Sequence, residues 1–345
     1  MKLGIIGLAR AGKTTVFEAL TGNLAEGAHK GESRIGTIRV PDERIDILSR
    51  LYTPRKTIYA TVAYFLPGFQ GGTREGGARE QQPWQQTRDC DALIHVVRNF
   101  SGYGFEVPRP AADLAALDQE LILADLVVVE KRLERLELDQ KRGKKPDLEE
   151  LALLTACRDG LEKELPLRAA PALAAAPQLR GFAFLSAKPM LVLFNNEDDD
   201  DAFPAAVGPV QRENGMVMRA KLEHELVQMS AEEAAEFLAE FAISESAMDR
   251  VIKKSYDLLG LISFFTVGED EVRAWTVRRG TAALDAADVI HSDIKKGFIR
   301  AEVLAYRDLM AAGSYAAARK QGTVRLEGKT YAMQDGDIVN FRFNL

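Results

Sequence analysis

The chain begins with a strand–loop–helix pattern that restricts the choice of folds more than any other part of the sequence. The apolar run at residues 3–6 leads directly into Gly7-Leu8-Ala9-Arg10-Ala11-Gly12-Lys13-Thr14, which fits the pattern G-x-x-x-x-G-K-[ST] in full. Residues 15–21 then read as a helix that Gly22 can end. This order predicts a P-loop NTPase domain of the α/β class, with a parallel sheet.

The glycine loop also predicts which groups would hold a nucleotide. Backbone N–H groups of such a loop curl around phosphates, and the N-terminus of the following helix adds a favourable dipole. Lys13 can reach the β- and γ-phosphates, and the Thr14 hydroxyl can bind Mg²⁺, the expected cofactor. The predicted phosphate-binding residues are Gly7, Ala9, Arg10, Ala11, Gly12, Lys13, Thr14 and Thr15.

Alternating strands and helices continue through the first part of the chain and return later. Apolar runs predict strands at the following residues: 35–40, 58–66, 92–97, 190–194 and 216–218. A short helix is expected over 42–51 and a helical segment over 231–259, while residues 67–86, rich in Gly and Gln, read as a mobile loop. We expect the nucleotide-binding domain to comprise residues 1–111 and 181–261.

Leucine spacing changes to steps of three and four from about Asp113, which predicts an antiparallel helical hairpin over residues 112–180. Asp147 should cap its second helix, and the stripe of that helix extends to Leu165. Strand-like runs at 264–267, 272–277 and 338–343 predict a separate α+β domain over residues 262–345.

Composition adds a few exclusions. Only two cysteines occur among 345 residues, the chain starts in a strand without room for a signal peptide, and no apolar run could span a bilayer. We therefore expect a cytoplasmic protein without a membrane partner, and a monomer, although the sequence leaves the oligomeric state open. A net charge of −6 gives no overall preference for nucleic acid.

Several motifs resemble those of the YchF family, also called the Obg-like ATPases, and they extend over essentially the whole chain. Near the N-terminus these are the P-loop and residues 40–44, 95–98 and 186–189. In the last domain they are residues 271–276, 290–293, 296–301 and 336–344, which match the TGS domain of that family. The resemblance implies a GTPase-type domain, a coiled-coil hairpin and a TGS domain. It also implies nucleotide hydrolysis with a preference for ATP, and association with ribosomes or RNA.

Two metal-binding positions of the family are altered here. The switch II motif Asp-x-x-Gly of the family reads Phe65-Leu66-Pro67-Gly68, and a phenylalanine ring cannot accept a hydrogen bond from a metal-bound water. The two residues directly after this four-residue stretch are Phe69 and Gln70. The switch I threonine falls near Lys30-Gly31, and Thr37 lies inside a predicted strand. Carboxylates at Glu75 or Glu80 are a hypothetical replacement.

The expected base-binding motif follows the strand at 190–194. The family has Asn-x-x-Glu where ordinary GTPases have Asn-Lys-x-Asp, and this chain has Asn195-Asn196-Glu197-Asp198. We predict that Asn195 and Asp198 face the base and that Ala220 and Lys221 close over it. A register shifted to Asn196 and Asp199, or a merely solvated acidic loop, remains open. The resemblance favours ATP over GTP.

Basic clusters provide the candidates for RNA contact. These residues are Lys141, Arg142, Lys144 and Lys145 at the hairpin tip, and Lys295, Lys296 and Arg300 in the last domain. The alternative interpretation is that the basic residues at the hairpin tip are only exposed to solvent and contact no RNA. His95 lies in a predicted buried strand, and we expect a hydrogen-bonded core histidine there.

Two functions remain open from the sequence. The first is a slow Mg²⁺-dependent NTPase whose cycle controls docking to a ribosome or RNA. The second is a catalytically degenerate adaptor, in which bound nucleotide only supports the structure. The intact P-loop favours binding in both cases, whereas Phe65 favours the second.

Overall fold

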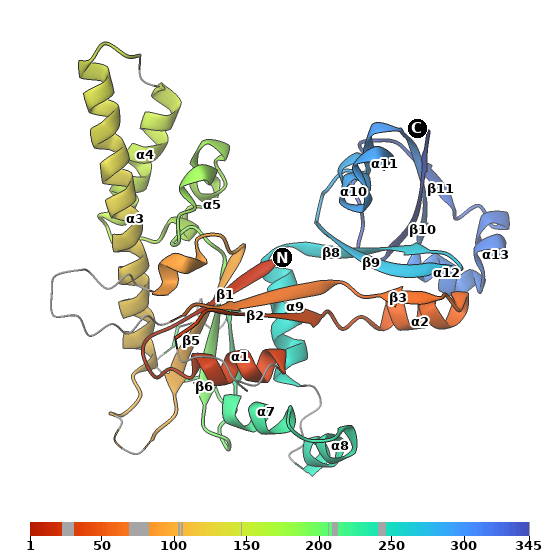
Figure 1. Cartoon of the computed structure of the whole chain (residues 1–345), viewed down its shortest axis with the longest axis horizontal. Helices are drawn as coiled ribbons and strands as arrows, with labels where there is room; N and C mark the ends of the chain where they lie inside the picture. The colour runs from red at the N-terminus through yellow and green to blue at the C-terminus, as the bar shows by residue number, and fades with distance from the viewer. Residues whose placement is uncertain are drawn as a thin grey trace. The chain divides into compact units, whose positions relative to one another are not determined.

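The computed structural model divides into two compact units, and we describe each by itself (Figure 1). Unit 1 comprises Met1–Ile38 and Ala63–Met248, and unit 2 comprises Arg39–Val62 and Asp249–Leu345. The structure describes these residues: 1–22, 31–68, 83–102, 104, 106–145, 147–205, 207–208, 213–240 and 246–344.

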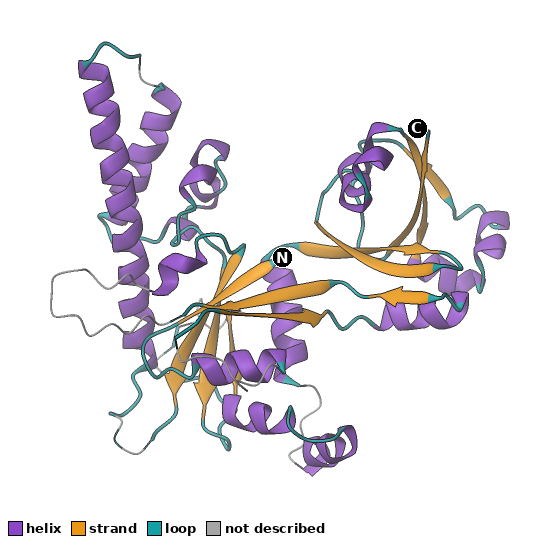
Figure 2. Cartoon of the chain, viewed as in Figure 1, coloured by secondary structure: helices purple, strands orange, loops and turns teal. Residues whose placement is uncertain are grey.

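Unit 1 is built on a six-stranded sheet in the order β2-β4-β1-β5-β6-β7. Figure 2 draws its strands in orange. These strands are β1 (Lys2–Ile6), β2 (Arg34–Arg39), β4 (Thr61–Leu66), β5 (Ala92–Asn99), β6 (Met190–Asn196) and β7 (Gly215–Met218). The central strand β1 pairs in parallel with β4 and β5, and β6 pairs in parallel with β5 and β7. Strands buried on both faces read as continuous apolar runs, and the alternation of these runs with helices is why the sequence predicted a parallel sheet. The expected α/β P-loop fold is confirmed.

The helices of unit 1 connect these parallel strands. Their bounds are α1 (Lys13–Thr21), η1 (Pro83–Thr87), α3 (Pro110–Lys141), α4 (Leu148–Leu161), η2 (Leu167–Ala169), α5 (Pro171–Ala174), η3 (Pro177–Phe182), α7 (Ala220–Leu226) and α8 (Ala231–Glu240). Gly22 ends α1 in the left-handed conformation, and its N–H bonds the Glu18 carbonyl, as the sequence predicted. The expected helical segment 231–259 divides into α8 and α9 (Ala247–Leu258).

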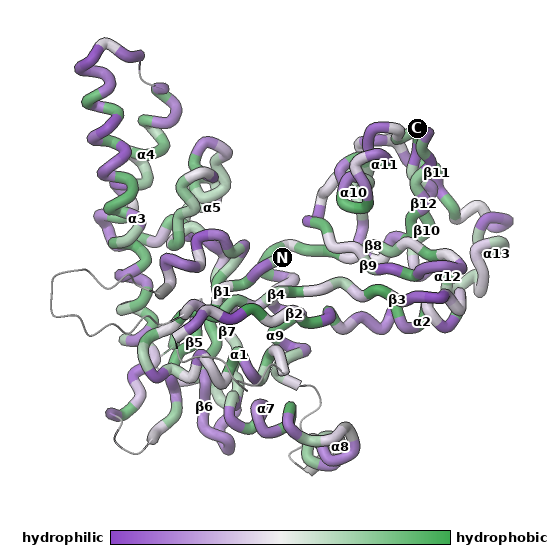
Figure 3. Tube along the Cα trace, in the orientation of Figure 1, coloured by the Kyte–Doolittle hydropathy of each residue, from purple (hydrophilic) through white to green (hydrophobic). Residues whose placement is uncertain are grey.

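Helices α3 and α4 form the expected antiparallel hairpin. Their buried residues include Leu121, Val129 and Leu154, which follow the predicted stripes, and hydrophilic residues gather at the tip (Figure 3). Asp147 caps α4 by accepting the N–H groups of Glu149 and Glu150. The stripe prediction was wrong at its end, because α4 stops at Leu161 and Leu165 is exposed beyond it.

Unit 2 contains a second six-stranded sheet, in the order β11-β10-β12-β8-β9-β3. Its strands are β3 (Lys56–Ile58), β8 (Leu261–Val267), β9 (Glu271–Arg278), β10 (Phe298–Ala305), β11 (Arg325–Glu327) and β12 (Asp337–Phe343). Its helices are α2 (Glu43–Tyr52), most of α9, α10 (Ala283–Ile290), α11 (Ser292–Lys296), α12 (Tyr306–Ala312) and α13 (Tyr315–Lys320). Phe264, Val303 and Phe341 lie at the centre of its core, which helix α10 covers.

The boundaries of the two units differ from the expected domain ranges at residues 39–62 and 249–261, both of which belong to unit 2. The expected strand over 58–66 is two strands in different sheets, β4 in unit 1 and β3 paired with β9 in unit 2. Within unit 2, Arg44 of α2 binds Asp42 and Asp335, and its guanidinium lies over the Phe265 ring. These contacts are distant in sequence, so the local apolar pattern could not reveal them.

Candidate nucleotide-binding site

The P-loop joins β1 to α1 through a backbone that L-residues seldom adopt. Gly7 has φ 153°, Arg10 has φ 62° and Gly12 has φ 92°. A side chain at Gly7 would overlap the Val96 carbonyl, and one at Gly12 would overlap the Asn195 amide. The two motif glycines are therefore required for close approach as well as for positive φ. Arg10 adopts the left-handed conformation without that freedom, a strained arrangement typical of functional loops.

Lys13 lies over its own loop. Its Nζ donates hydrogen bonds to the carbonyls of Gly7, at 2.9 Å, and Leu8, at 2.7 Å. Burial lowers the pKa of Lys13, because two neutral carbonyls replace only part of its hydration. A phosphate placed in the loop would supply the negative charge that this ammonium group lacks.

Asn195 connects the P-loop to the start of α7. At the end of β6 its side chain is almost fully buried. Its Nδ2 donates to the Ala11 carbonyl at 3.2 Å, and its Oδ1 accepts from the Ala220 N–H at 3.2 Å. One amide thus fixes the phosphate loop against the segment expected to close over the base.

The other predicted base-binding residues lie beside Asn195. Lys221 Nζ is 3.1 Å from Asp198 Oδ2, and this pairing raises the pKa of Lys221. The neighbouring Asn196 turns elsewhere: it donates to the Ala202 carbonyl and accepts from the Asn99 side chain. Asn195, rather than Asn196, is therefore the asparagine of this pair that contacts the P-loop.

Phe100 is a residue of this region that the sequence did not single out. It follows β5, and its Cε1 is 3.8 Å from the position that a Cβ on Gly12 would take. The next residue, Ser101, donates its N–H to Glu197 Oε1 at 2.5 Å. The loop after β5 therefore contacts the loop that is expected to bind the base. An aromatic residue placed directly after a buried strand was the available signal.

The altered switch II position lies on β4. Phe65 is buried, and Lys2 Nζ lies 4.3 Å from the centroid of its ring. The register Gly4–Phe65 between β1 and β4 places the following Gly68 near the P-loop edge of the sheet. Thr37 is an exposed residue within β2, so it is part of a strand rather than of the switch I loop. Lys30, Phe69, Gln70, Glu75 and Glu80 lie outside the described residues.

The residues present fit a magnesium ion carried in with the nucleotide. The Thr14 side chain at the first turn of α1 is exposed and available as a ligand. No cluster of three or more His, Cys, Asp or Glu side chains suited to a metal occurs in the part of the chain that the structure describes. Phosphate oxygens and water would have to complete the shell, which is the usual coordination of Mg²⁺ at nucleotides.

His95 differs from the expectation in one respect. It is fully buried on β5, as predicted, but neither ring nitrogen has a hydrogen-bond partner among the described residues. Burial, together with the positive charges of Arg168 and Lys13, lowers its pKa to about 3. The ring is therefore neutral, and the expected hydrogen-bonded histidine was wrong because its β-strand neighbours on both sides, Ile6 and Val192, are apolar.

The RNA candidates divide between the two units. Lys141, Arg142, Lys144 and Lys145 are exposed at the hairpin tip, and Lys144 pairs with Asp139. In unit 2 the lysines are bound by acids: Lys295 by Asp285 and Asp288, and Lys296 by Asp293.

Arg300 has a different environment. It lies directly opposite Arg342 in the β10–β12 ladder. Arg342 and Arg319 both pair with Glu302, whose side chain is 4% exposed. Like charges directly opposite each other are unfavourable in a sheet, and Glu302 offsets the charge of Arg342 here.

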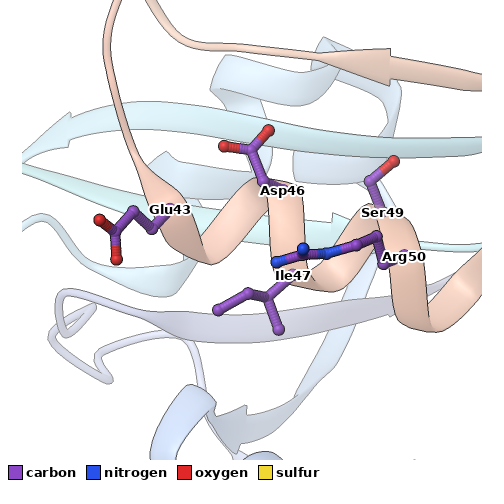
Figure 4. Close-up of a pocket in the computed structure, with 5 residues that line it drawn as sticks. All are labelled: Glu43, Asp46, Ile47, Ser49 and Arg50. Atoms are coloured by element: carbon purple, nitrogen blue, oxygen red, sulfur yellow. The ribbon is translucent and has the colours of Figure 1, made fainter.

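The pockets of unit 2 are weaker candidates for a ligand site than the P-loop region. One lies along α2 and is lined by Glu43, Asp46, Ile47, Ser49 and Arg50 (Figure 4). Asp46 accepts from Tyr59, and Ser49 shares a hydrogen bond with Thr57 of β3, so these polar groups attach α2 to its neighbouring strand. The lining combines both charges without a convergent set of groups.

Comparison with known proteins agrees with this geometry. A family model described as "Protein of unknown function (DUF933)", named YchF-GTPase_C, matches residues 261–344. The chain is 38% identical to the ribosome-binding ATPase YchF of Bacillus subtilis, over 99% of both chains. It is 35% identical to the protein of the same name in Pasteurella multocida, over 100% of this chain and 99% of that one.

Two solved structures resemble the whole chain. The YchF GTPase of Schizosaccharomyces pombe has a TM-score of 0.80 and 29% identity, and the match covers 99% of this chain and 97% of that one. A GTP-binding protein of Pyrococcus horikoshii has a TM-score of 0.60 and 19% identity over 100% of both chains, which supports the fold alone. No helix among the described residues is long and apolar enough to cross a membrane.

Proposed function

The chain belongs to the YchF family of P-loop proteins, and from this premise we propose that it binds ATP or GTP, hydrolyses it slowly and associates with ribosomes. The observation that carries the proposal is the Asn195 bridge, which connects the Ala11 carbonyl of the P-loop to the Ala220 N–H of the base-binding segment. This bridge would hold the proposed phosphate site and the proposed base site at a fixed separation. Association with ribosomes would place the protein in the cytoplasm, as expected from the sequence.

Phosphate binding would use the P-loop backbone and Lys13. The N–H groups between Ala9 and Thr15 would surround the anion, and α1 would present its N-terminus to it. Lys13 would exchange its bonds to Gly7 and Leu8 for phosphate oxygens. When bound through Thr14, Mg²⁺ would neutralise charge on the β- and γ-phosphates.

Base selection is proposed to rest on Asp198 and its surroundings. A carboxylate here can accept from guanine, but Lys221 already binds it at 3.1 Å, which reduces its capacity to do so. Phe100 beside Gly12 offers an aromatic face on which either purine could stack. The Bacillus and Pasteurella relatives are both named ATPases, so we propose ATP as the preferred ligand.

Slow turnover is expected because Phe65 occupies the position of a metal-directed carboxylate. The activity is tested by titrating ATP and GTP with and without Mg²⁺, followed by turnover measurements on the same sample. Mg²⁺-dependent binding with turnover above that of Lys13→Ala would support the NTPase. Mg²⁺-independent binding without turnover would instead support the adaptor, and an absence of binding would refute the nucleotide site altogether.

Nucleotide affinity is expected to fall at alkaline pH. The pKa of Lys13 is lowered in the free protein by burial, and a bound phosphate would raise it again. The complex then holds more protons than the free protein, so affinity decreases as pH rises through the lowered pKa, by up to about tenfold per pH unit. Dissociation constants measured between about pH 7 and pH 10 test this. A flat profile over that range would contradict it.

The ribosome contact is proposed to include the Arg300 face of unit 2, defined by Arg300, Arg319 and Arg342. Arg319 and Arg342 pair with Glu302, and Arg300 lies opposite Arg342, so these four side chains together carry a net positive charge. Such a surface suits phosphates of RNA.

Arg300→Ala is expected to weaken ribosome binding and to reduce the slope of log affinity against log salt concentration by about 1, as for one lost phosphate contact. Lys295→Ala is the control, because two aspartates already neutralise that lysine. Co-sedimentation with ribosomes at several salt concentrations measures both. Equal effects of the two variants would remove this face from the proposal.

A further inference from the structure

Gln86 holds the backbone of the switch II glycine by two hydrogen bonds. Its Oε1 accepts from the Gly68 N–H at 3.3 Å, and its Nε2 donates to the Gly68 carbonyl at 3.2 Å. The side chain thus occupies both polar groups of one residue, as a neighbouring strand would. Neither length is at the short end for such bonds, so they can be exchanged for stronger ones.

Gly68 follows the strand that pairs directly with the P-loop strand. Strand β4 runs parallel to β1 in the register Gly4–Phe65, which, continued by three residues, brings Gly68 level with Gly7 at the start of the P-loop. Gly68 is also buried against the end of the switch I region. A Cβ there would lie 2.7 Å from the Ser33 nitrogen and 2.9 Å from the Glu32 carbonyl carbon. A shift of Gly68 would therefore be felt by residues 31–33.

The short helix that carries Gln86 packs against the central sheet. It belongs to η1, whose Thr87 is fully buried and bonds the Trp84 carbonyl. Thr87 packs closely on β1, because a Cβ at Gly4 would lie 2.7 Å from its Cγ2. Thr87 thus fixes η1 against β1, the strand that leads into the P-loop. Gln86, on the same short helix, is exposed.

From these contacts we infer that Gln86 is a positioning residue that competes with the γ-phosphate for the Gly68 N–H and so sets the discrimination between tri- and diphosphates. This inference rests on the proposed nucleotide site. An anionic phosphate oxygen is a stronger acceptor than a neutral amide, so the γ-phosphate displaces Gln86 from the Gly68 N–H. A diphosphate, which lacks that group, leaves the Gln86–Gly68 bonds in place. Occupancy of the third phosphate is then passed to residues 31–33 through Gly68.

Two substitutions of Gln86 should change triphosphate affinity in opposite directions. Q86A removes the competitor, so triphosphate affinity rises by about 3–10-fold, the equivalent of one neutral hydrogen bond. Q86E keeps an acceptor for the Gly68 N–H but loses the donor to the Gly68 carbonyl. It also adds a negative charge that repels the γ-phosphate, so triphosphate affinity falls by about tenfold. Diphosphate affinity changes less than about twofold in both variants. Gln85→Ala, an exposed neighbour on the same turn, is the matched control.

The experiment measures dissociation constants of the full chain for the non-hydrolysable triphosphate analogue and the diphosphate of both adenosine and guanosine, with melting temperatures to verify folding. Opposite changes confined to the triphosphates confirm the inference. The inference is overturned by equal changes for tri- and diphosphates, by no change, or by weaker triphosphate binding of Q86A. In each of these cases, nucleotide binding by the wild-type chain leaves the proposed function intact. Failure of the wild-type chain to bind any of the four ligands removes both.

Discussion

Replacing Lys13 by alanine is expected to lower the affinity for ATP or GTP by at least about 100-fold. Charge-assisted hydrogen bonds to phosphate contribute about 1.5–3 kcal/mol each, and Lys13 now makes two bonds, to Gly7 and Leu8, that it would transfer to phosphate oxygens. Since about 1.4 kcal/mol corresponds to a factor of ten, the loss of two such bonds amounts to two orders of magnitude or more. Isothermal titration of the two proteins measures the difference.

A matched control separates this effect from a general change of charge. Lys131 is exposed on α3 in the same unit, and Lys131→Ala should leave affinity within about twofold of wild type. The Lys13 variant should remain folded, because removing an ammonium group that burial desolvates leaves no buried charge unpaired. Retention of wild-type affinity by folded Lys13→Ala would mean that the P-loop does not hold phosphate in this protein.

Asp125→Ala is expected to destabilise unit 1 strongly, by about 3–5 kcal/mol in the free energy of unfolding. Asp125 is fully buried on α3, and it accepts from the Leu185 N–H at 3.0 Å and the Ser186 N–H at 2.6 Å. Arg88 lies 3.4 Å from the same carboxylate. Its removal leaves two buried N–H donors without their acceptor and a guanidinium without its ion-pair partner.

Chemical denaturation monitored by circular dichroism provides the measurement. Glu130→Ala, an exposed acidic residue of the same helix, should change the free energy of unfolding by less than about 0.5 kcal/mol. Asp125→Asn should fall between the two, because the amide oxygen can still accept one of the two N–H bonds. If Asp125→Ala were as stable as the Glu130 control, the hairpin would not depend on this anchor.

The difference between Asp125 and its neighbours on α3 illustrates the limit of the sequence. The stripe of Ile122, Leu126 and Val129 predicted an amphipathic helix, because burial of apolar residues has the period of the helix itself. Asp125 lies on the same helix face as Leu121 and Val129, but the spacing does not show which groups an aspartate there would bind. Its partners at 185 and 186 are sixty residues further along the chain, and no local pattern encodes such a pairing.

The candidate site also contains residues that the local sequence predicted and residues that only the tertiary structure revealed. The phosphate loop could be read from eight consecutive residues, because glycine φ angles and the position of Lys13 are local properties. The choice between Asn195 and Asn196 could not, since it depends on which amide faces Ala11 on a distant loop. Gln86 was missed for the same reason, because its partner Gly68 lies 18 residues earlier in the chain.

The sequence by itself determined the P-loop, the parallel sheet, the helical hairpin and the family, since each is written in short-range periodicity or in contiguous motifs. The tertiary structure alone decided that residues 39–62 join unit 2, that Asp125 anchors the hairpin, and that Gln86 holds Gly68. These outcomes depend on contacts between residues far apart in the chain. The free energy of such contacts exists only once the backbone has brought the two partners together.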